Sequence, residues 1–266
     1  MAKPKVLIFS GYGLNSEEEA RYSIELVGGK ADIMHLNDII ENKNILQKYQ
    51  MLIFPGGFAY GDDTGSGNAY ANKLRNHLWG ELRKFIEKDT LIAGFCNGCQ
   101  ILSQLGLIPA IEHRYGEKQM TLLHNTTSRY VNRWVDLKSC NTSIWTKNIT
   151  TISAPMAHGE GRVYATDAVL KTMNDKNLIA FRYTVGMMCT YLDLAANPNG
   201  STEDIAGVTD ETGRILGLMP HPERGSEFTH LPNWPYLKEL LLRQGKKLPT
   251  EGPGLQIFKN AVEYFK

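Results

Sequence analysis

The sequence predicts an α/β protein whose mostly parallel central sheet is flanked by helices, with added antiparallel strands and C-terminal helices. Between residues 5 and 105, short apolar runs alternate with amphipathic stretches, and this alternation is typical of parallel strands joined by helices. Between residues 119 and 208 the apolar runs are shorter and Thr, Asn and Tyr are more frequent, which indicates antiparallel strands. Beyond residue 224, two amphipathic stretches predict helices.

The first half of the chain carries the clearest signals for individual elements. Apolar residues at 6–9 predict the first strand, and a Gly-rich turn separates it from a helix. We expect Ser16 to be the N-cap of that helix, because Glu19 follows three residues later and the first turn is acidic. The other elements expected in this half are strands at 31–35, 51–54 and 91–95, and helices at 74–87 and up to residue 105.

The second half is predicted to add strands at 134–137, 162–165 and 178–183. Near the C-terminus, apolar residues recur at helical spacing in two segments. These residues are Trp234, Leu237, Leu240 and Leu241 and, after a Gly-Pro-Gly turn, Leu255, Phe258, Val262 and Phe265. We expect both helices to pack back on the domain rather than to bind a partner.

Length, charge and composition narrow the class of protein. The 266 residues, of which 42% are hydrophobic, suffice for a domain with a sizeable buried core. The net charge is +1 and the Lys and Arg residues are scattered, so no basic stripe predicts binding to nucleic acid. The first residues show no signal-peptide apolar segment, and no apolar run is long enough to span a membrane. Four cysteines without framework spacing suit a reducing compartment, so we expect a cytoplasmic protein.

The most informative feature is the point at which the apolar run 90–95 stops. There, Gly94-Phe95-Cys96-Asn97-Gly98 leads directly into a helical stretch, which is the pattern of a nucleophile elbow with a thiol in place of a hydroxyl. The two glycines permit the close backbone approach that such a turn needs. The helix start places amides near the sulfur, which favours the thiolate and provides donors for an oxyanion. Cys96 is therefore the candidate nucleophile.

A base for this thiol is available in the segment Pro220-His221-Pro222-Glu223. Because the two prolines disfavour a helix, we expect an extended stretch in which His221 and Glu223 project to the same side. A carboxylate could then orient the imidazole while the other ring nitrogen faces the thiol. The alternative is a surface turn with no chemical role.

Together, the Cys96 elbow and the Pro-His-Pro-Glu segment resemble a class I (triad) glutamine amidotransferase. Further blocks resemble the glutaminase-subunit family of phosphoribosylformylglycinamidine synthase, an enzyme of purine biosynthesis. These blocks lie at residues 55–62, 125–134, 155–162, 181–183 and 197–201. The resemblance implies a flavodoxin-like amidotransferase domain over residues 1–266, with a core at about 5–224 and a helical extension at 225–266.

The resemblance also implies the chemistry. Cys96 would attack the side-chain amide of L-glutamine, His221 would carry the proton, and Glu223 would fix the imidazole. The oxyanion donors would be the backbone amides of Asn97, at the elbow, and of Gly57, which is assigned by resemblance alone. Gln100 matches the position at which the family holds the substrate glutamine.

A partner is implied as well. The chain shows no phosphate-binding loop and no clustered carboxylates for magnesium, so we expect no cofactor or metal in this chain, and ATP and magnesium on a separate synthetase subunit. The chain departs from the family pattern at two places. In Asn15-Ser16-Glu17 the family usually has Cys at the middle position. The loop at 61–67 is closer to that of glutaminases fused to a large synthetase. The partner is thus either one large synthetase or a smaller one with a small accessory subunit.

Several other features allow competing interpretations. Cys96 and Cys99 could form a redox pair or half of a zinc site, although Cys99 is better explained as a small core residue. The segment His158-Gly159-Glu160 could be a second catalytic pair, but such a segment is more often a turn between strands. Arg129, Arg133 and Arg162 are candidates for contacts with a phosphorylated substrate or a partner, and Gly11-Tyr12-Gly13 only partly matches a dinucleotide fingerprint.

Two other functional classes stay open at this stage. One is a cysteine hydrolase of the same fold that acts on peptides or small amides and needs no partner. The other is an inactive binding module that scaffolds a synthetase. The first would ignore glutamine analogues, and the second would leave Cys96 unreactive.

Overall fold

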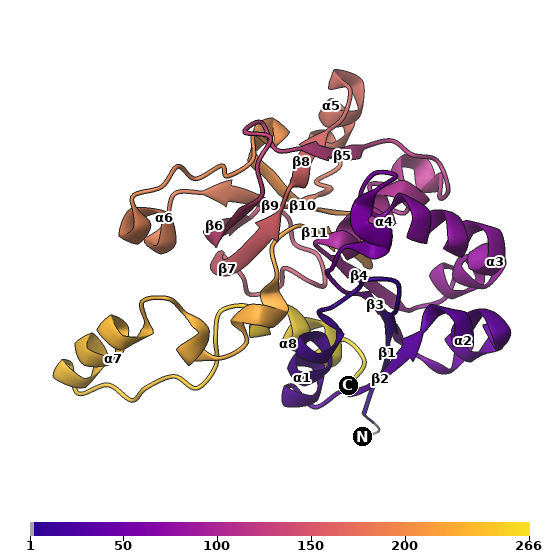
Figure 1. The fold of residues 1–266 in the computed structure, drawn as a ribbon. Helices are drawn as coiled ribbons and strands as arrows, with labels where there is room; N and C mark the ends of the chain where they lie inside the picture. Colours follow the sequence, from indigo (N-terminus) through magenta and orange to yellow (C-terminus); the bar gives the residue numbers. More distant parts are fainter. Residues whose placement is uncertain (1–2) are drawn as a thin grey trace.

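The computed structural model describes residues 3–266 and shows one nine-stranded sheet with helices on both sides (Figure 1). The strand order is β2-β1-β3-β4-β11-β10-β9-β6-β7, and a small second sheet pairs β5 with β8. The strands are β1 (Lys5–Ser10), β2 (Lys30–His35), β3 (Met51–Phe54), β4 (Leu91–Phe95), β5 (Thr121–His124), β6 (Val131–Ser139), β7 (Thr151–His158), β8 (Glu160–Tyr164), β9 (Ile179–Thr184), β10 (Ile205–Thr209) and β11 (Ile215–Leu218). Met1 and Ala2, which belong to the segment analysed above for a signal peptide, lie outside the described residues.

The α-helices follow the predicted alternation in the first half of the chain. They are α1 (Glu17–Leu26), α2 (Leu36–Glu41), α3 (Asn68–Ile86), α4 (Asn97–Leu105), α5 (Asp167–Asp175), α6 (Met187–Leu192), α7 (Trp234–Arg243) and α8 (Leu255–Glu263). Strands β2, β1, β3, β4 and β11 pair in parallel, and the others in the large sheet pair antiparallel. The predicted fold class, a mostly parallel α/β core with added antiparallel strands, is confirmed.

The antiparallel half contains the three strands predicted there and three that were missed, which are β5, β7 and β10. The predicted strands at 134–137, 162–165 and 178–183 correspond to β6, β8 and β9. Strand β5 is only four residues long, and β7 carries Pro155 at its centre. Proline is tolerated in β7 because this strand forms an edge of the sheet, where a missing N–H costs no ladder bond.

Two predictions about helices were wrong in detail. Helix α3 begins at Asn68 rather than at residue 74, because the polar first turn, which carries no amphipathic signal, follows Gly67 directly. Ser16 occupies the N-cap position of α1, but its side chain caps no helix amide. Its hydroxyl instead accepts a hydrogen bond of 2.8 Å from Arg224, so tertiary contact replaces the predicted capping box.

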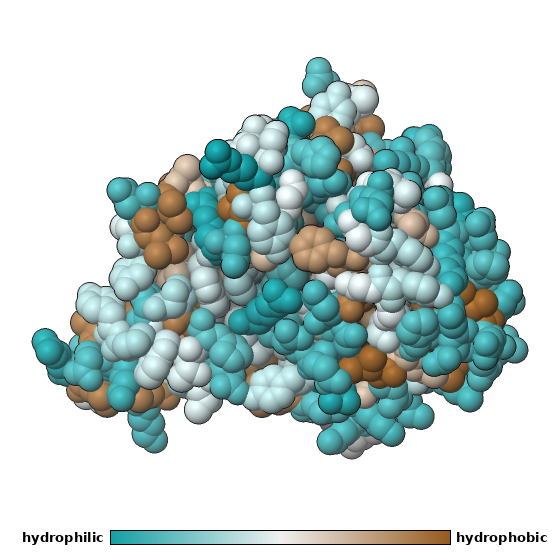
Figure 2. All heavy atoms as spheres, in the orientation of Figure 1, coloured by the Kyte–Doolittle hydropathy of each residue, from teal (hydrophilic) through white to brown (hydrophobic). Residues whose placement is uncertain are grey.

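The C-terminal helices differ from each other. Helix α8 packs back on the sheet as expected: Phe258 is buried, and its ring lies 5.5 Å from that of Phe95, the last residue of β4. Helix α7 buries none of its residues and projects from the body (Figure 1). Its Tyr236 and Leu242 are exposed, and hydrophobic residues show between hydrophilic ones in this projecting region (Figure 2). The expectation that both helices pack back thus holds for α8 and only partly for α7.

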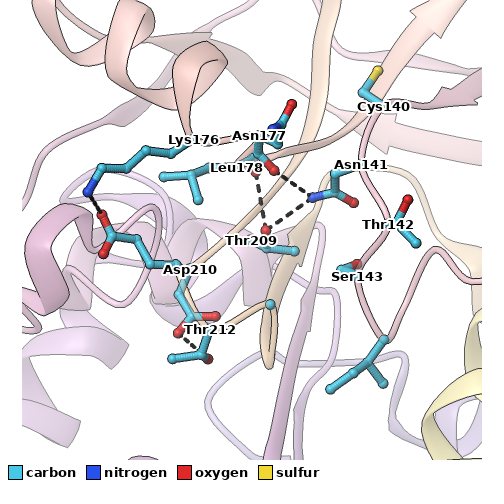
Figure 3. Close-up of a pocket in the computed structure, with 13 residues that line it drawn as sticks. Cys140, Asn141, Thr142, Ser143, Lys176, Asn177, Leu178, Thr209, Asp210 and Thr212 are labelled. Carbon is cyan, nitrogen blue, oxygen red and sulfur yellow. Dashed lines mark hydrogen bonds and ion pairs between the residues drawn. The ribbon is translucent and has the colours of Figure 1, made fainter.

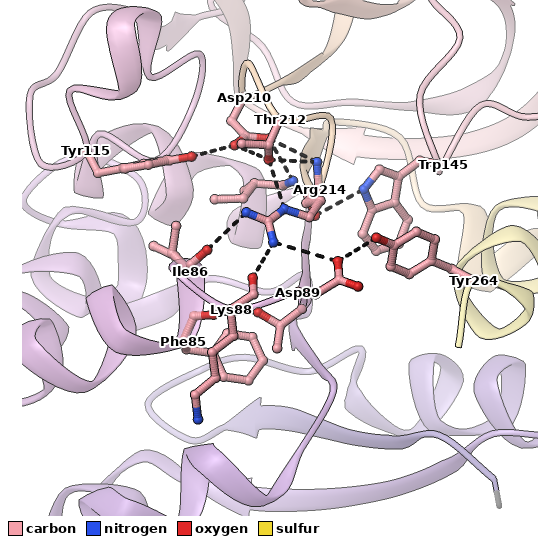
Figure 4. Close-up of polar contacts among 12 residues, drawn as sticks. Phe85, Ile86, Lys88, Asp89, Tyr115, Trp145, Asp210, Thr212, Arg214 and Tyr264 are labelled. Carbon is pink, nitrogen blue, oxygen red and sulfur yellow. Dashed lines mark hydrogen bonds and ion pairs between the residues drawn. The ribbon is translucent and has the colours of Figure 1, made fainter. Parts of the chain in front are cut away.

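At the end of the sheet where β11 begins, Arg214 ties several elements together (Figure 4). Its guanidinium donates to the backbone carbonyls of Ile86, at 3.2 Å, and of Lys88, both at the end of α3. Asp89 lies 3.8 Å from the same guanidinium and accepts a hydrogen bond of 2.5 Å from Tyr264, which follows α8. These contacts anchor the C-terminal segment to the parallel half of the sheet.

We expect Phe258→Ala to lower the free energy of unfolding by about 3–5 kcal/mol, because it leaves a cavity beneath the strand that leads to Cys96. Chemical denaturation with a two-state fit measures this. The matched control is Tyr236→Ala on the exposed face of α7, which should change stability by less than about 0.5 kcal/mol. Equal losses for both variants would contradict the packing described here.

Candidate active site

Cys96 occupies the turn between β4 and α4, and two glycines make that turn possible. A Cβ at Gly98 would lie 1.8 Å from the carbonyl oxygen of Phe54, and a Cβ at Gly94 would lie 2.5 Å from the carbonyl oxygen of Gly98. Both distances are far below van der Waals contact, so only glycine fits at either position. The predicted elbow is therefore present, with α4 pressed against the end of β3.

The backbone of Cys96 is strained, with φ at +50° and ψ at −108°. Such a conformation costs about 1–3 kcal/mol for a residue with a side chain. Its amide donates to the carbonyl of Leu218 at 2.9 Å, which continues the pairing of β4 with β11 past the strand end. The thiol donates to the carbonyl of Ala157 at 3.6 Å. The sulfur is thus held between the parallel sheet and the edge strand β7.

His221 and Glu223 form a buried pair beside this thiol. Nδ1 of His221 lies 2.6 Å from Oε1 of Glu223, and both residues are 2% exposed. The predicted extended conformation is wrong, because Pro222–Gly225 forms a single 3-10 turn. The turn nevertheless brings the two side chains together, since Pro222 suits the first position of a helical turn as well as an extended segment.

Two backbone contacts hold the imidazole in place. The amide of His221 donates to the carbonyl of Pro155 at 2.7 Å, so the edge of β7 orders the segment that follows β11. A Cβ at Gly56 would lie 2.4 Å from Cε1 of His221, which means that the ring lies directly against the loop after β3. Gly56 is therefore required for space, a role that the sequence did not reveal.

The electrostatic environment of His221 favours its protonated form. Burial lowers the pKa of the imidazole, but the carboxylate of Glu223, the neighbouring sulfur of Cys96 and the hydrogen bond to Glu223 raise it to about 10. An imidazolium beside the sulfur stabilises a thiolate. The arrangement therefore places a protonated imidazole beside the sulfur of Cys96, with Glu223 on the far nitrogen.

The loop after β3 presents the amide of Gly57. Leu14 and Gly57 form an isolated antiparallel bridge, in which the amide of Asn15 bonds to the carbonyl of Gly56 at 2.9 Å and the amide of Phe58 to the carbonyl of Gly13 at 2.8 Å. In such a pair, the N–H and C=O of the two opposed residues point away from each other. The amide of Gly57 thus faces away from Leu14. Gly57 also has φ at +150°.

Asn97 and Gln100, on the first turn of α4, are joined by their side chains. The amide nitrogen of Asn97 donates to Oε1 of Gln100 at 2.7 Å, and its oxygen accepts from the backbone of Ala59 at 3.1 Å. Nε2 of Gln100 donates to the carbonyl of Glu160 at 2.5 Å. The sequence assigned only the backbone of Asn97 to the site, whereas its side chain also connects the elbow to the loop that carries Gly57.

His158 and Glu160 do not form the pair that was considered from the sequence. Nδ1 of His158 lies 3.2 Å from Oδ1 of Asn125, whereas the carboxylate of Glu160 accepts from the backbone of Ser66 at 3.1 Å and lies 3.4 Å from His124. Gly159 lies between β7 and β8, so the alternative interpretation as a turn between strands is confirmed.

Three of the remaining candidate residues, Cys99, Arg133 and Arg162, are buried or bonded to other groups of the protein. Cys99 is buried in the core, burial raises its pKa, and all four cysteines are free. Arg133 donates to the backbone carbonyl of Ala196 at 3.3 Å, and Arg162 to that of His124 at 3.1 Å. Among residues 3–266, no three His, Cys, Asp or Glu side chains are grouped as a metal site would require.

A cavity of about 580 Å³ lies at the opposite end of the sheet, between the loop after β6 and the turn before β11 (Figure 3). Polar residues line it, including Asn141, Lys176 and Asp210. Asn141 donates to the carbonyl of Asn177 at 3.1 Å and Lys176 pairs with Glu211 at 2.5 Å, so these groups already have partners within the protein. None of the residues that line this cavity belongs to the elbow around Cys96.

Comparisons with known proteins agree with this geometry. A family model for the CobB/CobQ-like glutamine amidotransferase domain matches residues 3–265. Subunit PurQ of phosphoribosylformylglycinamidine synthase from Methanococcus maripaludis is 45% identical, over 98% of this chain and 97% of that protein. PurQ from Dehalococcoides mccartyi is 37% identical, over 99% of this chain and 98% of that protein. The chain belongs to the PurQ glutamine amidotransferases.

Solved structures support the assignment of this chain to the amidotransferase family. A chain in the structure of PurLQS from Thermotoga maritima superposes with a TM-score of 0.72 at 28% identity, with full coverage of both chains. A glutamine amidotransferase from the same organism has a TM-score of 0.51 at 12% identity, covers 99% of this chain and 92% of that chain, and supports the fold alone. No helix within residues 3–266 is both long and apolar enough to cross a membrane.

The backbone conformation of Cys96 is strained for any residue with a side chain. We therefore expect Cys96→Gly to be more stable than Cys96→Ala by about 1–2 kcal/mol. Glycine relieves the left-handed conformation, and its greater freedom in the unfolded chain offsets part of the gain. Urea denaturation of the two variants measures the difference. Equal stability, or a more stable Cys96→Ala, would show that the turn is not strained.

The raised pKa of His221 also predicts how stability depends on pH. In the unfolded chain the imidazole has its ordinary pKa of 6.5, and in the folded protein about 10, so its contribution is complete below pH 6.5 and is lost as the pH rises toward 10. We therefore expect the stability advantage of the wild type over His221→Asn to shrink across this range. Denaturation of both proteins at a series of pH values measures it, and an advantage that grows with pH would contradict the assignment.

Proposed function

We propose that this chain is the glutaminase subunit of phosphoribosylformylglycinamidine synthase. It hydrolyses L-glutamine to glutamate and ammonia, and delivers the ammonia to a synthetase subunit that converts formylglycinamide ribonucleotide to formylglycinamidine ribonucleotide in purine biosynthesis. The observation that carries the proposal is the buried His221–Glu223 pair, joined at 2.6 Å, beside the strained Cys96 elbow. The 45% identity to PurQ from Methanococcus maripaludis over nearly the full chain supports the substrate and the reaction.

In the first half of the reaction, the Cys96 thiolate attacks the carbonyl carbon of the glutamine side-chain amide. The imidazolium of His221 gives its proton to the departing nitrogen as the C–N bond breaks, which releases ammonia and leaves a glutamyl thioester on the sulfur. The 2.6 Å hydrogen bond from Nδ1 to Glu223 holds the ring in the orientation that this transfer needs.

The tetrahedral intermediate of this step carries an oxyanion. We assign its stabilisation to the backbone amides of Gly57 and Asn97. Asn97 is the first residue of α4, so its amide has no acceptor within the helix. Gly57 presents its amide away from the bridge with Leu14. Two donors of this kind contribute through their fixed position, at no cost of reorganisation during the reaction.

Gln100 is assigned to binding the substrate glutamine. Its carboxamide is buried and held at both ends, by Asn97 and by the carbonyl of Glu160. A pre-oriented side chain of this kind loses little entropy when the substrate binds.

In the second half, water attacks the thioester. The now neutral His221 removes a proton from the water as the C–O bond forms, and the C–S bond then breaks to release glutamate and restore the Cys96 thiolate and the imidazolium. Glutamine and water are thus converted to glutamate and ammonia, and the protein returns to its initial state.

The ammonia requires an acceptor that this chain does not supply. We assign ATP and magnesium to the synthetase partner, with no cofactor or metal in this chain, and a cytoplasmic location to the complex. The structural relative from Thermotoga maritima was solved as PurLQS, which supports a separate synthetase partner for this chain.

We expect an electrophilic glutamine analogue to add once to the protein, at Cys96. Cys96 is the residue beside the imidazolium, whereas Cys99 is buried in the core. Intact-mass spectrometry and peptide mapping measure the adduct, and glutamine should suppress it. Cys96→Ala should carry no adduct and should lose glutaminase activity by at least about a thousandfold, whereas Cys140→Ala should behave like the wild type.

The labelling experiment also separates the competing functions. A partner-free amidase would show labelling that glutamine does not suppress. An inactive binding module would show no adduct either alone or after the synthetase is added. An adduct only in the presence of the synthetase would mean that the oxyanion loop assembles on docking, and would leave the proposed reaction in place.

A further inference from the structure

A buried hydrogen-bond acceptor lies near the triad and has no partner in the mechanism above. His158, the last residue of β7, is 3% exposed, and its Nε2 is buried without a hydrogen-bond partner within the described residues. Buried polar atoms without partners are rare because they cost about 1–3 kcal/mol each. Such an atom can accept a hydrogen bond from a small donor, either a bound water or a ligand.

The protonation state of His158 follows from its neighbour Asn125. The side-chain nitrogen of Asn125 donates to the carbonyls of Arg129 and His158, both at 2.9 Å, which fixes the orientation of the amide. Its Oδ1 is therefore an acceptor, and it faces Nδ1 of His158 at 3.2 Å. Nδ1 must carry the proton, so Nε2 is an unprotonated lone pair.

This lone pair cannot readily become a proton donor. Burial, and after it the positive charge of His221, lower the pKa of His158 to about 3. The ring contacts the neutral side-chain amide of Asn125, and a Cβ at Gly161 would lie 2.1 Å from its Cε1. At neutral pH the imidazole therefore accepts hydrogen bonds at Nε2 and has no proton to give there.

His158 is also adjacent to the reacting groups along β7. Ala157, the preceding residue, accepts the hydrogen bond of the Cys96 thiol at 3.6 Å, and Pro155 accepts that of the His221 amide at 2.7 Å. Both imidazoles are buried, and His158 directly follows the residue whose carbonyl meets the Cys96 thiol. A ligand that reaches Nε2 must be small, since the atom is closed to bulk solvent.

We propose that Nε2 of His158 is a binding site for the ammonia released at Cys96, and that it accepts a hydrogen bond from ammonia on its way to the synthetase. This inference rests on the proposed glutaminase function. Ammonia has one heavy atom and carries N–H donors, which suits a single buried acceptor. No bond is made or broken at this site. Because the neutral ring does not donate a proton at Nε2, the ammonia stays unprotonated and keeps its nucleophilic lone pair.

The first test measures coupling in the complete complex of this chain with its synthetase. Glutamate released per amidine formed should be close to one in the wild type and should rise roughly fivefold in His158→Phe, the factor expected for the loss of one hydrogen bond. His158→Gln, which keeps an acceptor oxygen, should restore coupling. The matched control is His77→Phe on the exposed surface of α3, which should leave the ratio unchanged.

Two further readouts separate this role from a structural one. Synthesis driven by added ammonium chloride should be the same in all variants, since the synthetase is unaltered. A His158→Phe complex that releases glutamate slowly but with unchanged coupling would overturn the proposal, because it would indicate a purely structural histidine. If the wild-type complex forms no glutamate from glutamine, the proposed function itself fails. If it does and coupling never changes, only the present inference fails.

A direct measurement covers the case in which His158→Phe does not fold. In the wild-type chain labelled with ¹⁵N-histidine, ammonium chloride titrated at pH 8 should shift the Nε2 resonance of His158, whereas potassium chloride at equal ionic strength should not. An unshifted resonance, with Nε2 already bonded to a structural water, would overturn the proposal.

Discussion

The site depends on the close approach of α4 to the end of β3. The helix can begin directly at the nucleophile only because Gly98 has no side chain where the carbonyl of Phe54 lies, and because Gly94 has none against Gly98. This packing holds Cys96 at φ +50° and presents its sulfur outside the sheet. The strain is sustained by the surrounding core, where Phe54 and Phe95 are fully buried. A stable parallel sheet is therefore a condition for the chemistry and not merely its support.

The antiparallel half of the sheet contributes through its edge. Strand β7 pairs with β6 on one side, and the carbonyls of Pro155 and Ala157 reach His221 and Cys96. Residues two apart in a strand direct their carbonyls to the same side, so one edge of β7 contacts both the His221 amide and the Cys96 thiol. Such an edge would otherwise present unpaired backbone groups to solvent or to other chains. Here two of these carbonyls accept hydrogen bonds from His221 and Cys96, so the antiparallel half takes part in ordering both residues.

Local signals in the sequence were sufficient for the first four parallel strands and for the pairing of His221 with Glu223. The glycines around Cys96 and the pairing of His221 with Glu223 leave short-range marks in residue type and spacing, and the structure brings His221 and Glu223 into contact. The features that were missed depend on distant contacts. They arise only when segments far apart in the sequence meet. Examples are the space that Gly56 leaves for His221 and the edge position of Pro155. A third is the hydrogen bond from Arg224 to Ser16, which replaces the predicted capping role of Ser16. The helical turn at Pro222–Gly225 was missed because proline suits both an extended segment and a first helical turn.

Two buried imidazoles have opposite pKa shifts, and one cause links them. The carboxylate of Glu223 and the sulfur of Cys96 hold a proton on His221, whose positive charge then adds to burial in keeping His158 neutral. The protein thus separates an imidazole that gives a proton from one whose free nitrogen, Nε2 of His158, accepts a hydrogen bond. A thiol protease needs only the first of these groups. An enzyme that must release an amine and keep it unprotonated for a second reaction benefits from both, and the division of charge between His221 and His158 therefore fits a glutaminase that supplies a partner better than one that acts alone.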